Sequence, residues 1–207
     1  MKFLLTIIGV VCLLATLSIG AAPGLRFRPA DGDIIFQTSL STQSRAIQLA
    51  TRSRYSHMGI IFYRRGRPYV FEAAATVRYT PLPLWINKGK DGHYVIKRLK
   101  GQVLGRNTIN RLRKTSRTFS GKPYDLYFGW SDKRLYCSEL VWKIYKRAMG
   151  IDIGQLQRLE KFDLDHPVVR KKLTERYGKY LPLKERVISP QAMFASRRLV
   201  TVWSGSN

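Results

Sequence analysis

The chain has 207 residues, of which 44% are hydrophobic, 12% aromatic and 24% charged. This size and composition allow one buried core and exclude a disordered protein, and the lack of any internal repeat excludes fibrous and solenoid classes. Lysine and arginine number 37 against 13 aspartate and glutamate residues, a formal net charge of +24. Such a surface attracts polyanions, but charge alone does not choose between nucleic acid, anionic lipid and envelope phosphates.

The first 22 residues have the layout of a secretory signal. Met1 and Lys2 supply a positive start, Phe3–Ala22 form an apolar run ending in small residues, and Pro23 begins polar sequence. We therefore expect a signal peptide at 1–22, a single domain at 23–207, and an exported protein that is periplasmic or secreted. The apolar run is also long enough for an uncleaved membrane anchor, which is the alternative to cleavage.

Export would shape the expected partners and the thiol chemistry. It makes an anionic envelope surface the expected partner of the positive charge, rather than nucleic acid. Removal of the signal would take away Lys2 and Cys12, leaving 36 basic against 13 acidic residues and Cys137 as the remaining cysteine. An unpaired thiol in an oxidising compartment needs a reason, and two cysteines are too few for a disulfide scaffold.

The mature sequence predicts clustered strands and separate helices, which favours an α+β fold. From Gln155 onward we expect short helical patterns broken by three prolines. No linker divides the chain, so one domain is expected. The predicted strands are 32–36, 56–63, 69–73, 77–79 and 93–99, and the predicted helical segments are 44–53, 84–88, 104–119 and 135–149, the last being the strongest.

Cys137 opens the strongest predicted helix. Its spacing from Leu140, Val141 and Ile144 places it on the apolar face, which by itself fits a buried core cysteine. A thiol in the first helical turn also meets unpaired backbone N–H groups and the positive end of the helix dipole, which favour a thiolate and can receive an oxyanion. Core residue and nucleophile are the two open interpretations.

A thiol nucleophile needs a base, and the chain has three histidines. His166 fits a solvated loop or helix cap, and His93 fits a surface turn. His57 begins an apolar predicted strand, whose rigid backbone would hold the ring in place. His57 is therefore the candidate base, with a purely structural histidine as the alternative.

Glu72 is the candidate for the group that orients His57. Antiparallel pairing across the turn at 64–68 places it beside the strand of His57, as a same-face neighbour or on the diagonal. Valine, phenylalanine and alanine flank it, which is unusual for a solvated carboxylate. An exposed edge carboxylate is the alternative.

Other polar residues near these motifs receive structural interpretations. Asp33 fits a turn carboxylate, with a role at the site as the alternative, and Ser138 and Glu139 fit capping of the helix start. The sequence carries no metal-ligand cluster, phosphate-binding loop or dinucleotide fingerprint, so we expect neither metal nor cofactor.

Four motifs together resemble one known group of enzymes. Tyr136-Cys137-Ser138-Glu139, preceded by Gly121-Lys122-Pro123-Tyr124, resembles the nucleophile region of NlpC-like cell-wall cysteine peptidases, but here the histidine precedes the cysteine. That order is typical of the circularly permuted branch, the YaeF/YiiX-type papain-like amidases. The segments 32–36, 55–57 and 71–73 also resemble that branch, and the similarity runs over about 31–190.

The resemblance implies a papain-like α+β fold, with a small antiparallel sheet packed against the nucleophile helix. It implies Cys137 as nucleophile, His57 as general base and acid, and Glu72 as the group orienting His57. The implied reaction is hydrolysis of an amide, ester or thioester bond through a thioacyl intermediate. Separately, the strongly basic charge favours the acidic peptides of peptidoglycan as the expected substrates. Two alternatives stay open: a lipid amidase or acyltransferase of the same fold, and a non-catalytic basic protein that binds envelope polyanions.

Overall fold

A computed structural model of the chain describes residues 27–206, and the predicted signal segment at 1–22 lies outside them. Within the described range, no helix is both long enough and apolar enough to cross a membrane. The strands are β1 (Ile34–Ser39), β2 (His57–Arg64), β3 (Arg67–Ala73), β4 (Val77–Pro81), β5 (Gly89–Leu99), β6 (Gln157–Arg158), β7 (Arg186–Val187) and β8 (Leu199–Ser206). The helices are α1 (Ser44–Thr51), α2 (Leu82–Ile86), α3 (Arg106–Arg117), α4 (Cys137–Met149), the 3₁₀ turn η1 (Leu159–Lys161), α5 (Pro167–Tyr177) and α6 (Pro190–Phe194).

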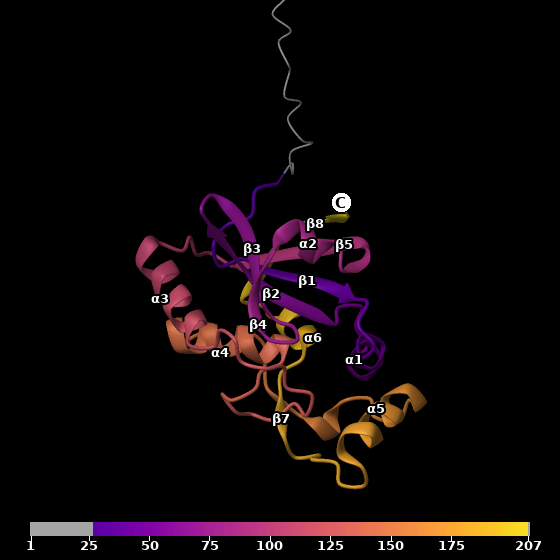
Figure 1. The fold of residues 1–207 in the computed structure, drawn as a ribbon. Helices are drawn as coiled ribbons and strands as arrows, with labels where there is room; N and C mark the ends of the chain where they lie inside the picture. The colour runs from indigo at the N-terminus through magenta and orange to yellow at the C-terminus, as the bar shows by residue number, and fades with distance from the viewer. Residues whose placement is uncertain (1–26, 207) are drawn as a thin grey trace, which may run out of the picture.

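Six of these strands form one antiparallel sheet in the order β4-β3-β2-β1-β5-β8 (Figure 1). The hairpins β2–β3 and β3–β4 connect sequence neighbours, and β8 returns from the end of the chain to pair with β5. The mixture of this sheet with separate helices confirms the predicted α+β class.

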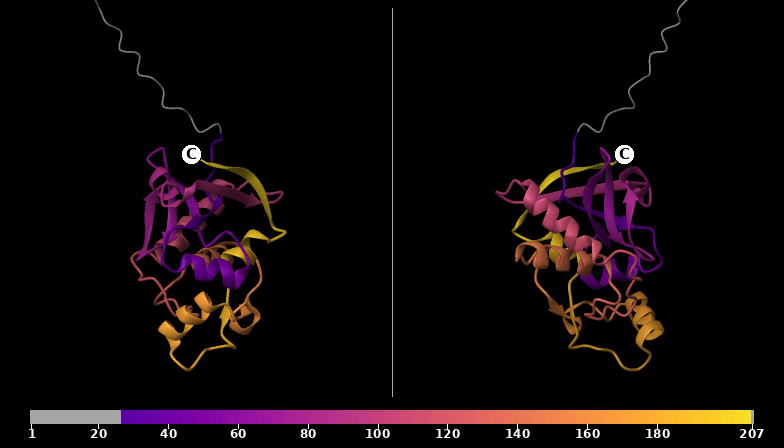
Figure 2. Two further views of the ribbon diagram at one scale, coloured as in Figure 1. Left: turned by 90° about the vertical axis from the view of Figure 1, so that its right-hand side faces the viewer. Right: turned by 60° about the vertical axis from the view of Figure 1, so that its left-hand side comes forward.

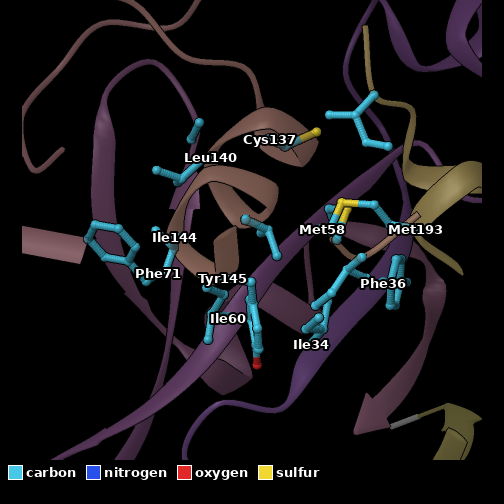
Figure 3. Close-up of a cluster of buried hydrophobic side chains, with 14 of the residues drawn as sticks. Ile34, Phe36, Met58, Ile60, Phe71, Cys137, Leu140, Ile144, Tyr145 and Met193 are labelled. Atoms are coloured by element: carbon cyan, nitrogen blue, oxygen red, sulfur yellow. The ribbon is translucent and has the colours of Figure 1, made fainter. Parts of the chain in front are cut away.

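Helix α4 packs on one face of the sheet, against β2 and β3, with α3 alongside it. Alternate strand residues, among them Ile34, Ile60 and Phe71, point to this face, as the two-residue period of a strand requires. Leu140 and Ile144 of α4 meet them in the close-up of this core (Figure 3). The helix that carries Cys137 is therefore fixed by apolar burial along its length.

The other face of the sheet is also buried, under α2. Ile35, Ile61 and Val70 point to that side and pack with Trp85 of α2. Burial of both faces explains why β1 and β2 have continuous apolar runs rather than alternating patterns.

Figure 2 shows a second group of elements at one end of the sheet, where α5 and the β6–β7 pair lie beyond α1 and α4. Helix α5 contacts α1. The linker between β7 and α6 is held against α4, because Ser138 Oγ donates to the Ile188 carbonyl at 2.7 Å.

Two sequence predictions were wrong in ways that matter for the fold. The last third is not only helical, because 199–206 form the edge strand β8, whose β-branched and aromatic residues favour a strand. Pro167 and Pro190 do not break helices but occupy the first turns of α5 and α6, where a missing N–H costs nothing.

Candidate active site

Cys137 is the first residue of α4, two residues later than the predicted start of that helix. Its side chain is buried and lies at the helix end that Figure 3 shows beside the core. Glu139 Oε2 accepts from the Tyr136 backbone N–H at 3.3 Å, and the Ile188 backbone N–H donates to the Tyr136 hydroxyl at 3.0 Å. The thiol is thus held at the positive end of the helix dipole, beside N–H groups that lack partners within the helix.

His57 and Glu72 form a buried pair at the same end of the sheet. Nε2 of His57 lies 2.6 Å from Oε2 of Glu72. Thr80 Oγ1 donates to the other carboxylate oxygen at 2.6 Å, and Trp85 Nε1 donates to Oε2 at 2.9 Å. The Trp85 ring also stacks against the His57 ring, with centroids 5.8 Å apart. Three donors and an aromatic cover therefore fix the carboxylate and the imidazole.

The pairing of β2 with β3 makes this contact diagonal. Ile60 faces Phe71, so continuing the register places Gly59 opposite Glu72 and His57 two residues away on the same face. A Cβ atom at Gly59 would lie 2.7 Å from the Phe71 carbonyl oxygen and 2.4 Å from a Val70 methyl. Glycine is thus required for β3 to approach closely enough for Glu72 to reach His57.

The surroundings of His57 favour its charged form. Burial by itself opposes the charge, but the hydrogen bond to Cys137, the bond to Glu72 and the charges of both outweigh it and raise the pKa of His57 to about 10. Since Nε2 is bonded to Glu72, Nδ1 is the ring nitrogen left for the thiol. Burial would raise the pKa of Glu72, but the bond and charge of His57 and the donors Thr80 and Trp85 lower it overall. Cys137, His57 and Glu72 therefore interact electrostatically, with His57 between the thiol and the carboxylate.

Two cavities meet at the group formed by Cys137, His57 and Glu72. An apolar cavity of about 90 Å³ is lined by Cys137 and side chains of α1 and α5, and a more polar groove is lined by His57 and Glu72. Four residues border both: Gln43, Tyr124, Lys172 and Arg176. A substrate bond placed at this boundary would reach the thiol and the imidazole together.

Comparisons with known proteins agree with this arrangement. Residues 28–203 match the family model described as permuted papain-like amidase enzyme, YaeF/YiiX, C92 family. The chain belongs to the YaeF/YiiX family of permuted papain-like amidases. It is 50% identical over 182 residues to the uncharacterised protein YiiX of Escherichia coli strain K12, covering 88% of this chain and 90% of that protein. It also superimposes on a crystal structure described as metalloprotein yiiX from Escherichia coli O157:H7 with a TM-score of 0.84, 51% identity, and coverage of 87% of this chain and all of the other.

The description of that relative as a metalloprotein raises the question of a metal in this YaeF/YiiX-family chain. Between residues 27 and 206, the His, Cys, Asp and Glu side chains form no group of three suited to hold a metal ion. The side chains of this part of the chain therefore do not fit a metal site.

Three further side chains at the site did not emerge from the sequence. Thr80 and Trp85 reach Glu72 only through the β3–β4 hairpin and α2. The Tyr124 hydroxyl accepts a hydrogen bond from Gln43 Nε2 at 2.9 Å. Burial, followed by the charge of Cys137, raises the pKa of Tyr124 well above its usual value. The signal for Tyr124 was present in Gly121-Lys122-Pro123-Tyr124, which resembled the family without suggesting a role.

The other polar residues considered from the sequence have structural contacts. Asp33 is buried and binds Arg98 with two hydrogen bonds of 2.6 and 2.8 Å, at the opposite end of β1 from the residue that faces His57. His93 lies inside β5 rather than in a turn, because that strand begins at Gly89, and it lines neither cavity. His166 caps α5, accepting from Val168 N at 3.2 Å, as expected. Glu139 caps the start of α4 and pairs with Lys143 at 2.7 Å.

Proposed function

We propose that the protein is an exported cysteine amidase in which Cys137 is the nucleophile, His57 the general base and acid, and Glu72 the group that orients His57. The observation that carries the proposal is the position of the His57 ring, bonded through Nε2 to Glu72 and coupled to the thiol at the first residue of α4. Membership of a papain-like amidase family supports hydrolysis as the reaction class.

The chemistry follows from these positions. Cys137 attacks the substrate carbonyl carbon as a thiolate, while His57 carries the proton as imidazolium. Backbone N–H groups at the start of α4 receive the oxyanion, and removal of one such donor typically costs about 2.7–4 kcal/mol of transition-state stabilisation. Protonated His57 gives its proton to the leaving amine, leaving a thioester on Cys137. Neutral His57 then activates a water molecule, which releases the acid and restores the thiol.

The polar groove suits an acidic peptide substrate. Lys88, Arg134, Lys172 and Arg176 line it. Of the two acidic side chains in the groove, Glu175 pairs with Lys172 at 2.6 Å and Glu72 is bonded to His57. Peptidoglycan stem peptides carry free carboxylates, which such a groove attracts. We therefore propose peptide amides of the cell wall as substrates, with residues 1–22 directing the chain to that compartment.

The apolar cavity beside Cys137 favours a second candidate, an amidase or acyltransferase acting on lipids. Its walls include Ile47 of α1, Leu173 of α5 and Ile188 next to β7, side chains suited to an acyl chain rather than a peptide. In this case the acyl group would enter the cavity and the thioester would form on the same thiol.

A paired substrate series tests both candidates. We expect the full chain to release amine from muropeptide fragments, and the Cys137→Ala variant to release none. Preferential turnover of p-nitrophenyl esters with long acyl chains, with no action on muropeptides, would establish the lipid candidate instead. Failure of both series, with no acyl adduct on Cys137 by mass spectrometry, would contradict the enzyme proposal and leave the polyanion-binding alternative.

A further inference from the structure

A cluster of arginines lies at the end of β2 away from His57. The β2–β3 hairpin turns through Arg65 and Gly66, and Arg64, Arg65, Arg67 and Tyr69 line an open hollow at its tip. Within residues 27–206, no acidic side chain forms an ion pair with any of these three arginines. The hollow is thus surrounded by uncompensated positive charge.

Two features of the hairpin that holds these arginines together are energetically unfavourable. Arg64 and Arg67 are direct cross-strand partners, and like charges in that position repel. Arg65 has a φ of 49°, in the left-handed region that favours glycine or asparagine at such a turn. The turn therefore keeps Arg64, Arg65 and Arg67 close together at its tip, where an anion would relieve their mutual repulsion.

The arginine cluster contacts aromatic rings on the neighbouring strands, on the side of the sheet near α3. The Arg64 guanidinium lies 4.5 Å from the centre of the Tyr79 ring and 5.6 Å from that of Tyr69. Arg113 of α3 lies over the Phe62 ring of β2 at 5.0 Å, and just after α3 the Gly121 N–H donates to the Val77 carbonyl of β4 at 2.8 Å. The last turn of α3, which carries Arg117, is therefore joined to the strand of Tyr79. Burial raises the pKa of Tyr79, and the charges of Arg113, Arg64 and Arg117 oppose that rise. Arg113 is neutralised by Asp31 at 2.6 Å, whereas Arg117 has no acidic partner in the described part of the chain. Arg117 therefore extends the positive surface of the hairpin.

The described chain also starts at this end of the molecule. The Arg28 guanidinium lies 5.6 Å from the centre of the Tyr63 ring, next to Arg64, and Figures 1 and 2 show residues 27 onward entering the domain beside the hairpin. The sequence before residue 27 includes the apolar run Phe3–Ala22. Whether it acts as a signal before cleavage or as a retained anchor, an apolar run held in a bilayer brings the arginines that follow it close to anionic headgroups.

We propose that the β2–β3 hairpin, through Arg64, Arg65 and Arg67 with Arg117 of α3, docks the domain on a bilayer of anionic phospholipid. Guanidinium groups match phosphate oxygens in pairs, and several of them at one tip bind a surface of phosphates cooperatively. Seven residue steps along β2 separate Arg64 from His57, about 23 Å at the usual rise. Docking at the hairpin therefore holds the active site well away from the bilayer, facing soluble substrate.

Flotation of the full chain with lipid vesicles tests the proposal. The vesicles contain phosphatidylcholine alone or with about a third phosphatidylglycerol, at roughly 0.15 M salt. An apolar segment inserts into both, so the measured quantity is the gain in binding caused by the anionic lipid. We expect the triple variant Arg64→Gln, Arg65→Gln, Arg67→Gln to lose about tenfold or more of that gain.

The matched control removes three exposed lysines at the other end of the molecule, as Lys171→Gln, Lys179→Gln and Lys184→Gln. It should keep most of the gain, and both variants should unfold cooperatively on heating, which shows that each retains the folded domain. Equal losses in both variants would overturn the proposal in favour of net charge alone. It would also be overturned by equal wild-type binding to both vesicles, or by a hairpin-dependent affinity for duplex DNA without one for anionic vesicles.

Discussion

His57 and Glu72 are diagonal neighbours on adjacent strands, with Nε2 and Oε2 2.6 Å apart in a buried setting. This contact explains how two neighbouring strands fix the orientation of the His57 ring. The carboxylate fixes one ring nitrogen, Trp85 covers the ring, and the other nitrogen is left for the thiol of Cys137. Substitutions around this contact separate catalytic effects from structural ones.

Replacement of Glu72 by glutamine should reduce kcat/KM by at least about tenfold, because an amide cannot stabilise the imidazolium as a carboxylate does. The wild-type pKa of His57 is raised to about 10, so activity requiring the imidazolium should persist into alkaline solution. In the variant the alkaline limb of the pH profile should move toward neutrality. Glu160→Gln removes an exposed carboxylate that lines neither cavity, so it is the control and should move neither quantity. An unchanged limb in Glu72→Gln would contradict this role.

The raised pKa of His57 also gives stability a definite pH dependence. The folded protein retains a proton on His57 that the unfolded chain releases near the ordinary imidazole pKa of about 6.5. The resulting stabilisation is complete below that pH and is lost as pH rises through about 10. The difference in unfolding free energy between wild type and His57→Ala, measured in urea, should therefore shrink between those limits. A difference in unfolding free energy that grows as the pH rises would contradict a raised pKa for His57.

A methyl group at Gly59 should disturb the contact between His57 and Glu72 by changing the spacing of β2 and β3. Gly59→Ala brings a Cβ against the Phe71 carbonyl and pushes β3 away from β2, which separates Glu72 from His57. We expect a lower melting temperature and reduced kcat/KM. Gly105→Ala, where a Cβ meets open space, should leave kcat/KM within about twofold. Full activity in Gly59→Ala would mean that the close approach of the strands is not needed.

Asp33 should matter for stability and not for catalysis. Asp33→Asn breaks a buried pair with Arg98, and removing one partner of such a pair typically costs about 3–5 kcal/mol of unfolding free energy. Arg98 is partly exposed, so the lower end of that range is expected. Urea denaturation measures the loss, while kcat/KM measured below the transition should be unchanged. A large fall in kcat/KM without loss of stability would place Asp33 in the catalytic machinery.

The three residues of the candidate site could be singled out from the sequence because they lie in elements with strong local patterns. The apolar period of α4 located Cys137, and the turn at 64–68 placed Glu72 near His57. Trp85 and Thr80 could not be assigned, since their contact with Glu72 depends on how α2 folds over the sheet. The strand β8 was missed because its partner β5 lies about a hundred residues earlier, and local pattern carries no information on such pairing.

The central claim is that Cys137 and His57 act as a coupled pair. Its most direct test is the rate of alkylation of Cys137 by iodoacetamide as a function of pH, followed by mass spectrometry of the Cys137 peptide so that Cys12 does not contribute. We expect fast alkylation near about pH 5.5 in the wild type and a sharp slowing in His57→Ala. Slow alkylation that rises only near the ordinary thiol pKa of about 8.5, and is the same in both proteins, would contradict the claim and make Cys137 a structural core residue.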